Sequence, residues 1–290
     1  MKKEIKEAME KFAISEFEKK SEAINIPMSD GATIRIYRSI PAKEKFNGYS
    51  MIVMPGWGTV VPAWDQFLLE AVKDFDVIYF ESREKGSSDL PKTAKVGMER
   101  MAFDIHDIIK HLKLDESKVV LFGSCIGATT IAYGMFKNMY NPYLPVLVAP
   151  PARFEFPPVF RQLIPISPTF LWGAVQPIVR LWITKFKSNS PEQAAKYLRA
   201  AEEADAKKWK RLGLRLAFKR YWKMFPQVKN HVLLVAAEAD KMDDAKVTKK
   251  VDGLMENSTY VNLRSNKETH SPVMVNIIRE YLPKFSGKNH

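Results

Sequence analysis

The chain has 290 residues, of which 46% are hydrophobic and 27% are charged. This length suits one large domain with a buried core, and the composition excludes a disordered chain, a collagen-like repeat and a disulfide scaffold. The 45 Lys and Arg residues against 33 Asp and Glu residues give a formal charge of +12, which favours an acidic partner. The single cysteine, Cys125, excludes an intrachain disulfide and fits a reducing compartment, so we expect a cytoplasmic protein.

The first 20 residues form a segment in which lysines and glutamates alternate with apolar side chains. Ile5, Met9 and Phe12 recur at helical spacing and, together with Phe17, predict an amphipathic helix that packs on the rest of the protein or on a neighbour. No continuous apolar run of the length that a signal peptide needs follows, so we do not expect one here. We interpret residues 1–20 as an N-terminal helical extension.

Short apolar runs alternate with helical patterns along much of the remaining chain. The predicted strands flank a turn at residues 29–31 and then cover residues 50–54, 77–80, 119–122, 146–148, 231–235 and 260–263. The predicted helices cover residues 62–75, 98–114, 126–139, 246–255 and 271–285. This alternation predicts an α/β protein with a mostly parallel sheet flanked by helices on both faces. Functional groups in such sheets gather at the carboxyl ends of the strands.

Almost all of the excess positive charge lies in residues 151–230, which hold 16 Lys and Arg against 5 Asp and Glu. We expect this segment to be a helical insert between two parts of one core, residues 21–150 and 231–290. Its longest apolar stretch, residues 163–184, contains three prolines and Arg180, so we expect a buried or interfacial segment rather than a membrane span.

Residues 203–225, in the second half of the insert, predict a basic amphipathic helix, because Trp209, Leu212 and Leu216 lie among many lysines and arginines. Such a helix can lie on an anionic membrane surface, contact the phosphates of an acyl-coenzyme A or a phospholipid, or close a pocket with its apolar side. Nucleic-acid binding is not expected, because no known binding module is present and the aromatic residues follow helical spacing.

One local motif points to nucleophilic catalysis. An apolar strand leads directly into Gly123-Ser124-Cys125-Ile126-Gly127 and then into a helix. A nucleophile on such a sharp strand-to-helix turn is exposed above the sheet, and small flanking residues permit the close packing that the turn requires. The helix N-terminus also favours the thiolate form of Cys125. The alternative is that Cys125 is an inert cysteine of the hydrophobic core.

Four more motifs, in order along the chain, extend this pattern. They are Met54-Pro55-Gly56-Trp57-Gly58 after a strand, the turn Glu81-Ser82-Arg83-Glu84-Lys85-Gly86-Ser87-Ser88, Asp240 after a late strand, and His270 near the C-terminus. With these motifs the chain, from about Ile24 onward, resembles proteins of the α/β-hydrolase fold. The insert at residues 151–230 then corresponds to the lid that many members carry after the sixth strand.

The resemblance implies a catalytic triad of Cys125, His270 and Asp240, with the backbone N–H groups of Trp57 and Ile126 as the oxyanion hole. Asp243 and Asp244 are alternatives for the acid. Arg83 is expected to pair with a neighbouring carboxylate and to have a structural role. His106 and His111 lie five residues apart on a predicted helix, a poor spacing for a metal site. Neither a metal nor an organic cofactor is needed for this chemistry.

The sequence differs from the usual pattern of the fold at four positions. Cys125 replaces serine, as in dienelactone hydrolases and polyhydroxyalkanoate synthases, and Pro55 stands in place of a histidine. Glu84 and Thr269 stand where a glycine is common. We therefore expect an enzyme that cleaves or transfers the acyl group of an ester or thioester, with a hydrophobic acyl chain.

Three other functions remain open. The first is a catalytically weak or inactive protein that kept the binding site. The second is a protein that binds lipid or an anionic membrane surface through its basic lid. The third is a different reaction on the same fold, such as carbon–carbon bond cleavage or lactone opening. The sequence leaves the oligomeric state undetermined.

Overall fold

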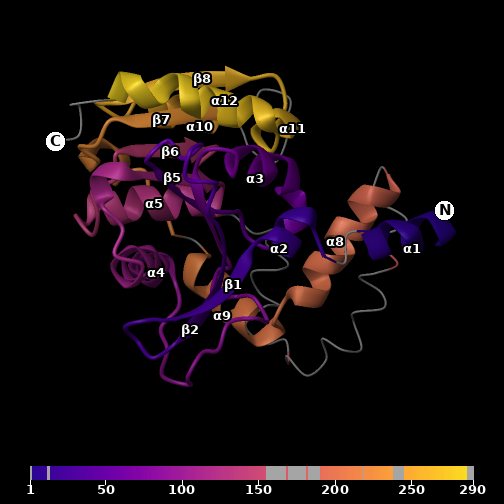
Figure 1. Ribbon diagram of the computed structural model, residues 1–290. Coiled ribbons are helices and arrows are strands. Elements are labelled where there is room, and N and C mark those ends of the chain that lie inside the picture. The colour runs from indigo at the N-terminus through magenta and orange to yellow at the C-terminus, as the bar shows by residue number, and fades with distance from the viewer. Residues whose placement is uncertain are drawn as a thin grey trace.

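A computed structural model describes residues 2–11, 14–154, 168, 181, 190–217, 219–237 and 245–285. An eight-stranded sheet runs through the molecule in the order β1-β2-β4-β3-β5-β6-β7-β8 (Figure 1). The first two strands pair antiparallel to each other, and β2 is antiparallel to β4, whereas every later pair is parallel. The predicted fold class, a mostly parallel sheet flanked by helices, is confirmed.

The strands are β1 (Glu22–Pro27), β2 (Thr33–Ser39), β3 (Ser50–Met54), β4 (Asp76–Phe80), β5 (Val119–Ser124), β6 (Leu144–Val148), β7 (Val232–Ala237) and β8 (Ser258–Leu263). The described α-helices are α1 (Lys2–Lys11), α2 (Glu16–Lys20), α3 (Asp65–Ala71), α4 (Met98–His111), α5 (Ile126–Phe136), α8 (Pro191–Glu203), α9 (Ala206–Leu216), α10 (Ala245–Asp252), α11 (Asn266–Thr269) and α12 (Pro272–Tyr281). Short 3₁₀ helices cover Val61–Ala63, Glu116–Lys118, Phe225–Gln227 and Leu282–Phe285.

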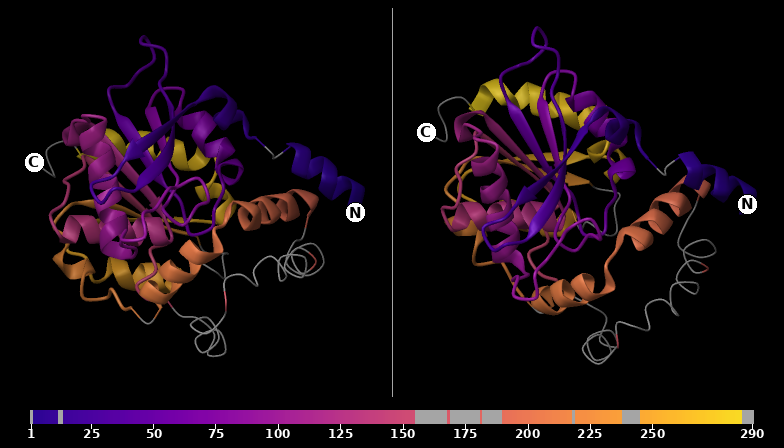
Figure 2. Two further views of the ribbon diagram at one scale, coloured as in Figure 1. Left: turned by 90° about the horizontal axis from the view of Figure 1, so that it is seen from below. Right: turned by 60° about the horizontal axis from the view of Figure 1, so that its bottom comes forward.

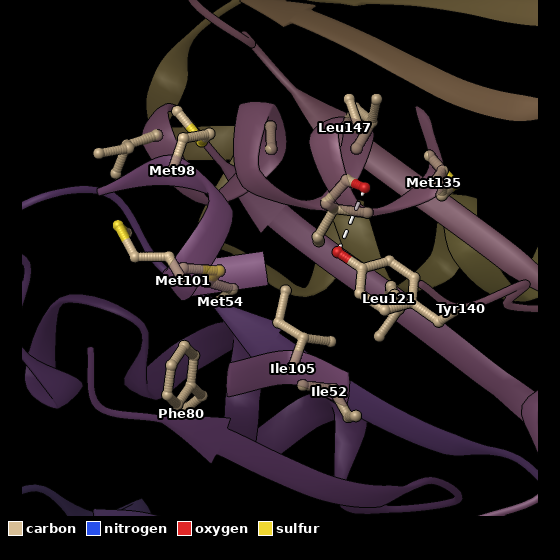
Figure 3. Packing of buried hydrophobic residues seen from close by; sticks show 14 of the residues in the cluster. Ile52, Met54, Phe80, Met98, Met101, Ile105, Leu121, Met135, Tyr140 and Leu147 are labelled. Carbon is tan, nitrogen blue, oxygen red and sulfur yellow. Dashed lines mark hydrogen bonds between the residues drawn. The ribbon is translucent and has the colours of Figure 1, made fainter. Parts of the chain in front are cut away.

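The central strands bury both of their faces, and successive side chains point to opposite sides of the sheet. In β3, Ile52 and Met54 pack in a cluster with α4, α5 and α10, whereas Met51 and Val53 pack against α2, α3 and α12. Figure 3 shows part of the first cluster, where Ile105 of α4 lies near Ile52. Continuous apolar strands are therefore required here, because helices cover both faces.

Several predicted helices end earlier or divide. The helix predicted at residues 62–75 is a 3₁₀ turn followed by α3, which ends at Ala71. The helix predicted at residues 271–285 begins at Pro272 and continues from Leu282 as a 3₁₀ helix. Pro283 lacks the N–H that a regular α-helical turn needs, which accounts for this change.

The N-terminal extension is two helices rather than one. Ser15 begins α2 with a capping box, in which its side chain accepts from the Glu18 amide and the Glu18 carboxylate accepts from the Ser15 amide. Phe17 on α2 is fully buried under the sheet, whereas Ile5 on α1 packs against α8. The prediction that Phe12 joins this apolar stripe lies outside the described residues.

The lid segment, residues 151–230, contributes α8 and α9 to the described structure. Helices α1 and α8 lie side by side and extend away from the sheet (Figure 2). The basic helix is shorter than predicted, because it ends at Leu216. Beyond it the Tyr221 amide donates to the Ala152 carbonyl, and Arg153 and Arg220 form a β-bridge, so the chain turns back toward the end of β6. The expected division at residues 150 and 230 stays a prediction.

None of the helices in the described ranges combines the length and the apolar character that crossing a membrane requires. The apolar stretch of residues 163–184 falls almost wholly outside these ranges.

One buried ion pair holds the turn after β4. The Arg83 guanidinium donates from Nε and Nη2 to both carboxylate oxygens of Asp104 on α4, each at 2.6 Å. Arg83 also contacts Asp30 in the β1–β2 turn and the Lys95 carbonyl. The side chains of Arg83 and Asp104 are 1% and 0% exposed, so the structural role expected for Arg83 is confirmed.

We expect R83M to lower the free energy of unfolding by about 3–5 kcal/mol, because it leaves the Asp104 carboxylate buried without its main partner. Chemical denaturation followed by circular dichroism measures this loss. The control K73M breaks the exposed pair between Lys73 and Glu70 and should cost less than about 1 kcal/mol. Equal losses in the two variants would contradict this interpretation of Arg83.

Candidate active site

Cys125 occupies the sharp turn between β5 and α5. Its backbone has φ 50° and ψ −120°, a left-handed conformation that non-glycine residues rarely adopt and that typically costs about 1–3 kcal/mol. Its amide donates to the Val148 carbonyl at 2.9 Å, which fixes the turn against the end of β6. The Cys125 side chain is half-buried. The next amide, that of Ile126, begins the helix, where backbone N–H groups have no acceptor within the helix.

Two glycines make this turn possible. A Cβ on Gly127 would lie 2.2 Å from the Met54 carbonyl oxygen, and a Cβ on Gly123 would lie 2.6 Å from the Ala128 nitrogen. Neither position can hold a larger residue without moving backbone. The close packing predicted from the small residues around Cys125 is therefore present.

The loop after β3, residues 55–58, lies directly against Cys125. A Cβ on Gly56 would lie 3.4 Å from the Cys125 Cβ atom. Trp57 follows in this loop, so its backbone is next to the residue that contacts Cys125. The backbone thus brings the loop that contains Trp57 close to Cys125 and Ile126.

His270 lies between α11 and α12 and stacks on Trp64. The two ring centroids are 3.8 Å apart with an angle of 30° between the ring planes. Trp64 also meets Phe122 of β5 edge to face at 5.5 Å. Phe122 precedes Cys125 by three residues, so Trp64 connects the strand that ends at Cys125 with the imidazole of His270.

The contacts of the His270 ring select its tautomer. Nδ1 lies 2.9 Å from the Asn266 carbonyl oxygen and 2.9 Å from the Thr269 hydroxyl. A carbonyl oxygen only accepts, so the contact with Asn266 is a hydrogen bond when Nδ1 carries the proton. The neutral ring then has Nε2 as its basic nitrogen, which is the form that a general base needs.

The predicted acid, Asp240, and its alternatives Asp243 and Asp244 lie outside the described residues. The strand that precedes them, β7, ends at Ala237 and is parallel to its neighbours β6 and β8. Among the described residues, no group of three or more His, Cys, Asp or Glu side chains could hold a metal ion.

Glu84 stands where a glycine is common in this fold, and the structure buries it in the turn after β4. Its side chain is 2% exposed, and its Oε1 accepts from the Ser82 hydroxyl at 2.6 Å. Burial raises the pKa of the Glu84 carboxyl, while the Ser82 hydroxyl and, more weakly, the Lys85 charge and the Gly58 amide oppose this shift. The only sign of this in the sequence is a charged residue at a position where a glycine is common.

The lid segment reaches the loop of residues 55–58 through Trp209 of α9. The rings of Trp57 and Trp209 have centroids 5.7 Å apart. Gly58 has φ 70°, and a Cβ there would lie 2.9 Å from Cη2 of Trp209. The loop of residues 55–58 is therefore packed between the turn at Cys125 and Trp209 of α9.

The chain is similar in structure to several solved hydrolases. A hydrolase from Pseudomonas aeruginosa PA01 superposes with a TM-score of 0.68 at 14% identity, covering 92% of this chain and 98% of the other. A thermophilic esterase from Thermogutta terrifontis gives 0.69 at 18% identity, and the enol-lactonase from Burkholderia xenovorans LB400 gives 0.69 at 15%. Each of these two comparisons covers 91% of this chain and 99% of the other.

These matches show that the chain has the α/β-hydrolase fold, as its motifs predicted. No protein-family model matches the sequence, and no curated protein matches it. Because the identities are low, the likeness establishes the fold alone, and the chemistry must be argued from the residues.

We expect E84Q to be more stable than the wild type at alkaline pH, with the difference shrinking as the pH falls. The pKa of Glu84 is raised in the folded state, so the unfolded chain releases this proton more readily. The stability contributed by the neutral carboxyl is complete below the unfolded-state pKa and is lost as the pH rises through the folded-state value. Denaturant titrations at several pH values measure this trend. The control variant E44Q, changed at an exposed position, should show no such pH-dependent difference from the wild type. If the wild type became more stable relative to E84Q as the pH rises, the prediction would be contradicted.

Proposed function

We propose that this protein is an enzyme with a cysteine nucleophile that cleaves or transfers the acyl group of an ester or thioester. The observation that carries the proposal is the left-handed backbone of Cys125, held at the end of β5 and directly against Gly56. Strained backbone of this kind persists where surrounding structure enforces it, and it is concentrated at active sites. An inert core cysteine has no need of it.

The reaction begins when the Cys125 thiol transfers its proton to Nε2 of His270 and the sulfur attacks the substrate carbonyl carbon. Asp240 is the proposed acid, whose negative charge stabilises the imidazolium, while the Asn266 carbonyl accepts from Nδ1. The stacked face of Trp64 also favours a cationic ring, because the π-system carries negative charge on its face. Collapse of the tetrahedral adduct expels the alkoxide or thiolate, which takes the proton from His270, and leaves an acyl thioester on Cys125.

The negative charge that develops on the substrate oxygen needs donors beside Cys125. The amides of Ile126, at the start of α5, and of Trp57 are the proposed donors. Removing one such donor in other enzymes costs about 3 kcal/mol of transition-state stabilisation. Gly56 lies against the Cβ atom of Cys125, so the loop that contains Trp57 and the start of α5 are both beside Cys125. This arrangement supports the two amides as a pair of donors.

The second half of the reaction transfers the acyl group to an acceptor. His270 removes a proton from water, an alcohol or a thiol, and the oxygen or sulfur attacks the thioester carbonyl. A thioester resists water more than it resists amines or thiols, so Cys125 favours transfer over plain hydrolysis. The aromatic rings of Trp57 and Trp209 beside the loop support a hydrophobic acyl chain.

The similar structures support bond cleavage at an acyl carbon. One is described as an esterase and another as an enol-lactonase, so this fold at this level of likeness accommodates both open-chain and cyclic esters. Lactone opening by the same residues is therefore a variant of the proposal, and a panel of esters, thioesters and lactones separates the two.

The first experiment uses the single cysteine, because one label per chain can arise only at Cys125. We expect iodoacetamide to label the native protein rapidly well below pH ~8.5, the ordinary pKa of a thiol, and we expect H270A to slow this labelling by about tenfold or more. Intact mass across a pH series measures both rates.

The matched control is H111A, which removes an exposed histidine on α4. Its labelling should follow the wild type. Labelling of the wild type that begins only near the ordinary thiol pKa, or only on unfolding, would identify Cys125 as a structural residue and remove the proposed enzyme.

A second candidate function is binding to an anionic membrane surface, and a specific group of cations favours it. Lys207 and Arg215 on α9, together with Lys219, Arg220 and Lys223 after it, are exposed, and none forms an ion pair with a side chain that the structure describes. Leu214, which is 42% exposed, lies on the same helix. Clustered cations with exposed apolar side chains bind anionic lipid headgroups.

We expect the protein to bind vesicles that contain phosphatidylglycerol more tightly than pure phosphatidylcholine vesicles. The triple variant K219E/R220E/K223E should lose at least about 100-fold in affinity, since each basic residue near such a surface contributes about 1 kcal/mol. Vesicle sedimentation measures the binding. The control K43E/K45E/K118E changes the net charge equally at exposed positions that precede β3 and β5, and it should keep most of the affinity. Equal losses would show a response to net charge alone.

A further inference from the structure

The connection between β3 and α3, residues 55–64, contacts both members of the proposed Cys–His pair. Near its start, Gly56 lies against the Cβ atom of Cys125. At its end, the indole of Trp64 stacks on the imidazole of His270, with the ring centroids 3.8 Å apart. The proposed nucleophile and the proposed base, which are far apart in the sequence, therefore meet the same short connection.

Trp64 is held firmly in the core. Its side chain is fully buried, and its ring meets Phe67 of α3 and Phe122 of β5 edge to face, with centroids 5.8 and 5.5 Å away. Strand β5 ends directly before Cys125. The indole thus presents a fixed face to the imidazole, and its position is tied to the strand that carries the nucleophile.

The two helices that follow the stacked rings are fastened to each other. Trp64 directly precedes α3, and His270 lies two residues before α12. Near the other end of α12, Arg279 pairs with Glu70 of α3 and with Asp74 beyond it, at 2.8 and 2.6 Å. Helices α3 and α12 therefore pack side by side, with ion pairs at one end and the stacked rings at the other.

The edge of the imidazole is held as well as its face. Nδ1 lies 2.9 Å from both the Asn266 carbonyl oxygen and the Thr269 hydroxyl, and this hydroxyl donates to the same carbonyl at 2.7 Å. Residues of α11 thus fix the edge of the ring, and Trp64 fixes the plane in which Nε2 lies.

The choice of tryptophan at this position is not explained by stability. The indole Nε1 of Trp64 is buried and makes no hydrogen bond to any residue in the described ranges. Burying an N–H group without a partner costs free energy, and a phenylalanine would avoid this cost. Tryptophan, however, binds a cation on its face better than phenylalanine does, and His270 lies well within the distance of about 6 Å that such an interaction needs.

The charged side chains on the elements that hold His270 have other surroundings. Asp65 of α3 accepts from the first two amides of α2, and Glu268 of α11 accepts from the amide that follows β8. Lys267 of α11 is exposed. The ionisable partners that the proposed reaction gives to the ring are Cys125 and Asp240.

We propose that Trp64 is a positioning residue that acts on Cys125 through His270. Its face fixes the plane of the imidazole and stabilises the imidazolium, so the Cys125 thiolate forms at a lower pH than it would without the indole. The inference rests on the proposed function, because it requires proton transfer from Cys125 to His270. It extends that function by assigning the reactivity of Cys125 at low pH to a residue outside the proposed triad.

The test measures alkylation of Cys125 by iodoacetamide across a pH series, with intact mass as the readout. The thiolate sulfur forms a bond to carbon and displaces iodide, so the midpoint of the rate profile reports where the thiolate forms. We expect W64L to move this midpoint upward by about 0.5–1.5 pH units, the size that loss of a cation–π interaction implies. W64F keeps an aromatic face and should move the midpoint in the same direction by less. Circular dichroism establishes that each variant is folded.

Two controls separate this role from packing. F75L removes another fully buried aromatic side chain from the same cluster and should leave the midpoint unchanged. In the H270A background, W64L should add no further shift, because the indole acts only through the imidazole.

Four results would overturn the inference. An unchanged midpoint in W64L, or in W64F where W64L does not fold, removes the role of Trp64. Equal shifts in W64L and F75L show a general response to lost packing. A further shift when W64L is added to H270A shows an effect that does not pass through His270. A wild type that is alkylated only near pH ~8.5 refutes the proposed function, and Trp64 then loses its role with it. The wild-type profile thus separates failure of the enzyme from failure of Trp64.

Discussion

The site depends on the contact between two backbones at Gly127. The first turn of α5 lies so close to the end of β3 that the Met54 carbonyl occupies the space where a side chain would begin. This contact sets the position of Cys125 and that of the loop which follows Met54. The proposed nucleophile and the proposed oxyanion donors thus share one packing constraint, which, with the hydrogen bond from Cys125 to Val148, maintains the unfavourable φ of Cys125.

Arg83 and Glu84, adjacent in the turn after β4, are both buried but have opposite relations to their surroundings. Arg83 finds both oxygens of Asp104 and the carboxylate of Asp30, so its burial is compensated. Glu84, the next residue, has only Ser82 as a hydrogen-bond partner among the described residues. Arg83 fastens the turn to the core, whereas the Glu84 carboxyl is buried with little compensation.

The fold and the elbow were predictable because they are encoded locally. Apolar runs marked the strands, and the small residues at 123 and 127 marked the close approach at Cys125. The helix expected beyond Leu216 was wrong, because Tyr221 pairs with Ala152, a contact between segments far apart in the sequence. The burial of Glu84 likewise depends on α8 and α9, and nothing in its neighbours along the chain reveals it. The place of Asp240 in the triad stays a prediction.

The packing of α1 on α8 has a consequence for the order in which the chain folds. Ile5 and Met9 of α1 meet Ala194 and Leu198 of α8, residues that leave the ribosome much later. A ten-residue helix is marginal in water on its own. During synthesis the apolar side of α1 therefore stays uncovered until α8, which follows six of the eight strands, has been made. Contacts of such long sequence separation slow folding and leave an early intermediate prone to association. Helix α1, although made before α8, is therefore among the last parts to reach its final place.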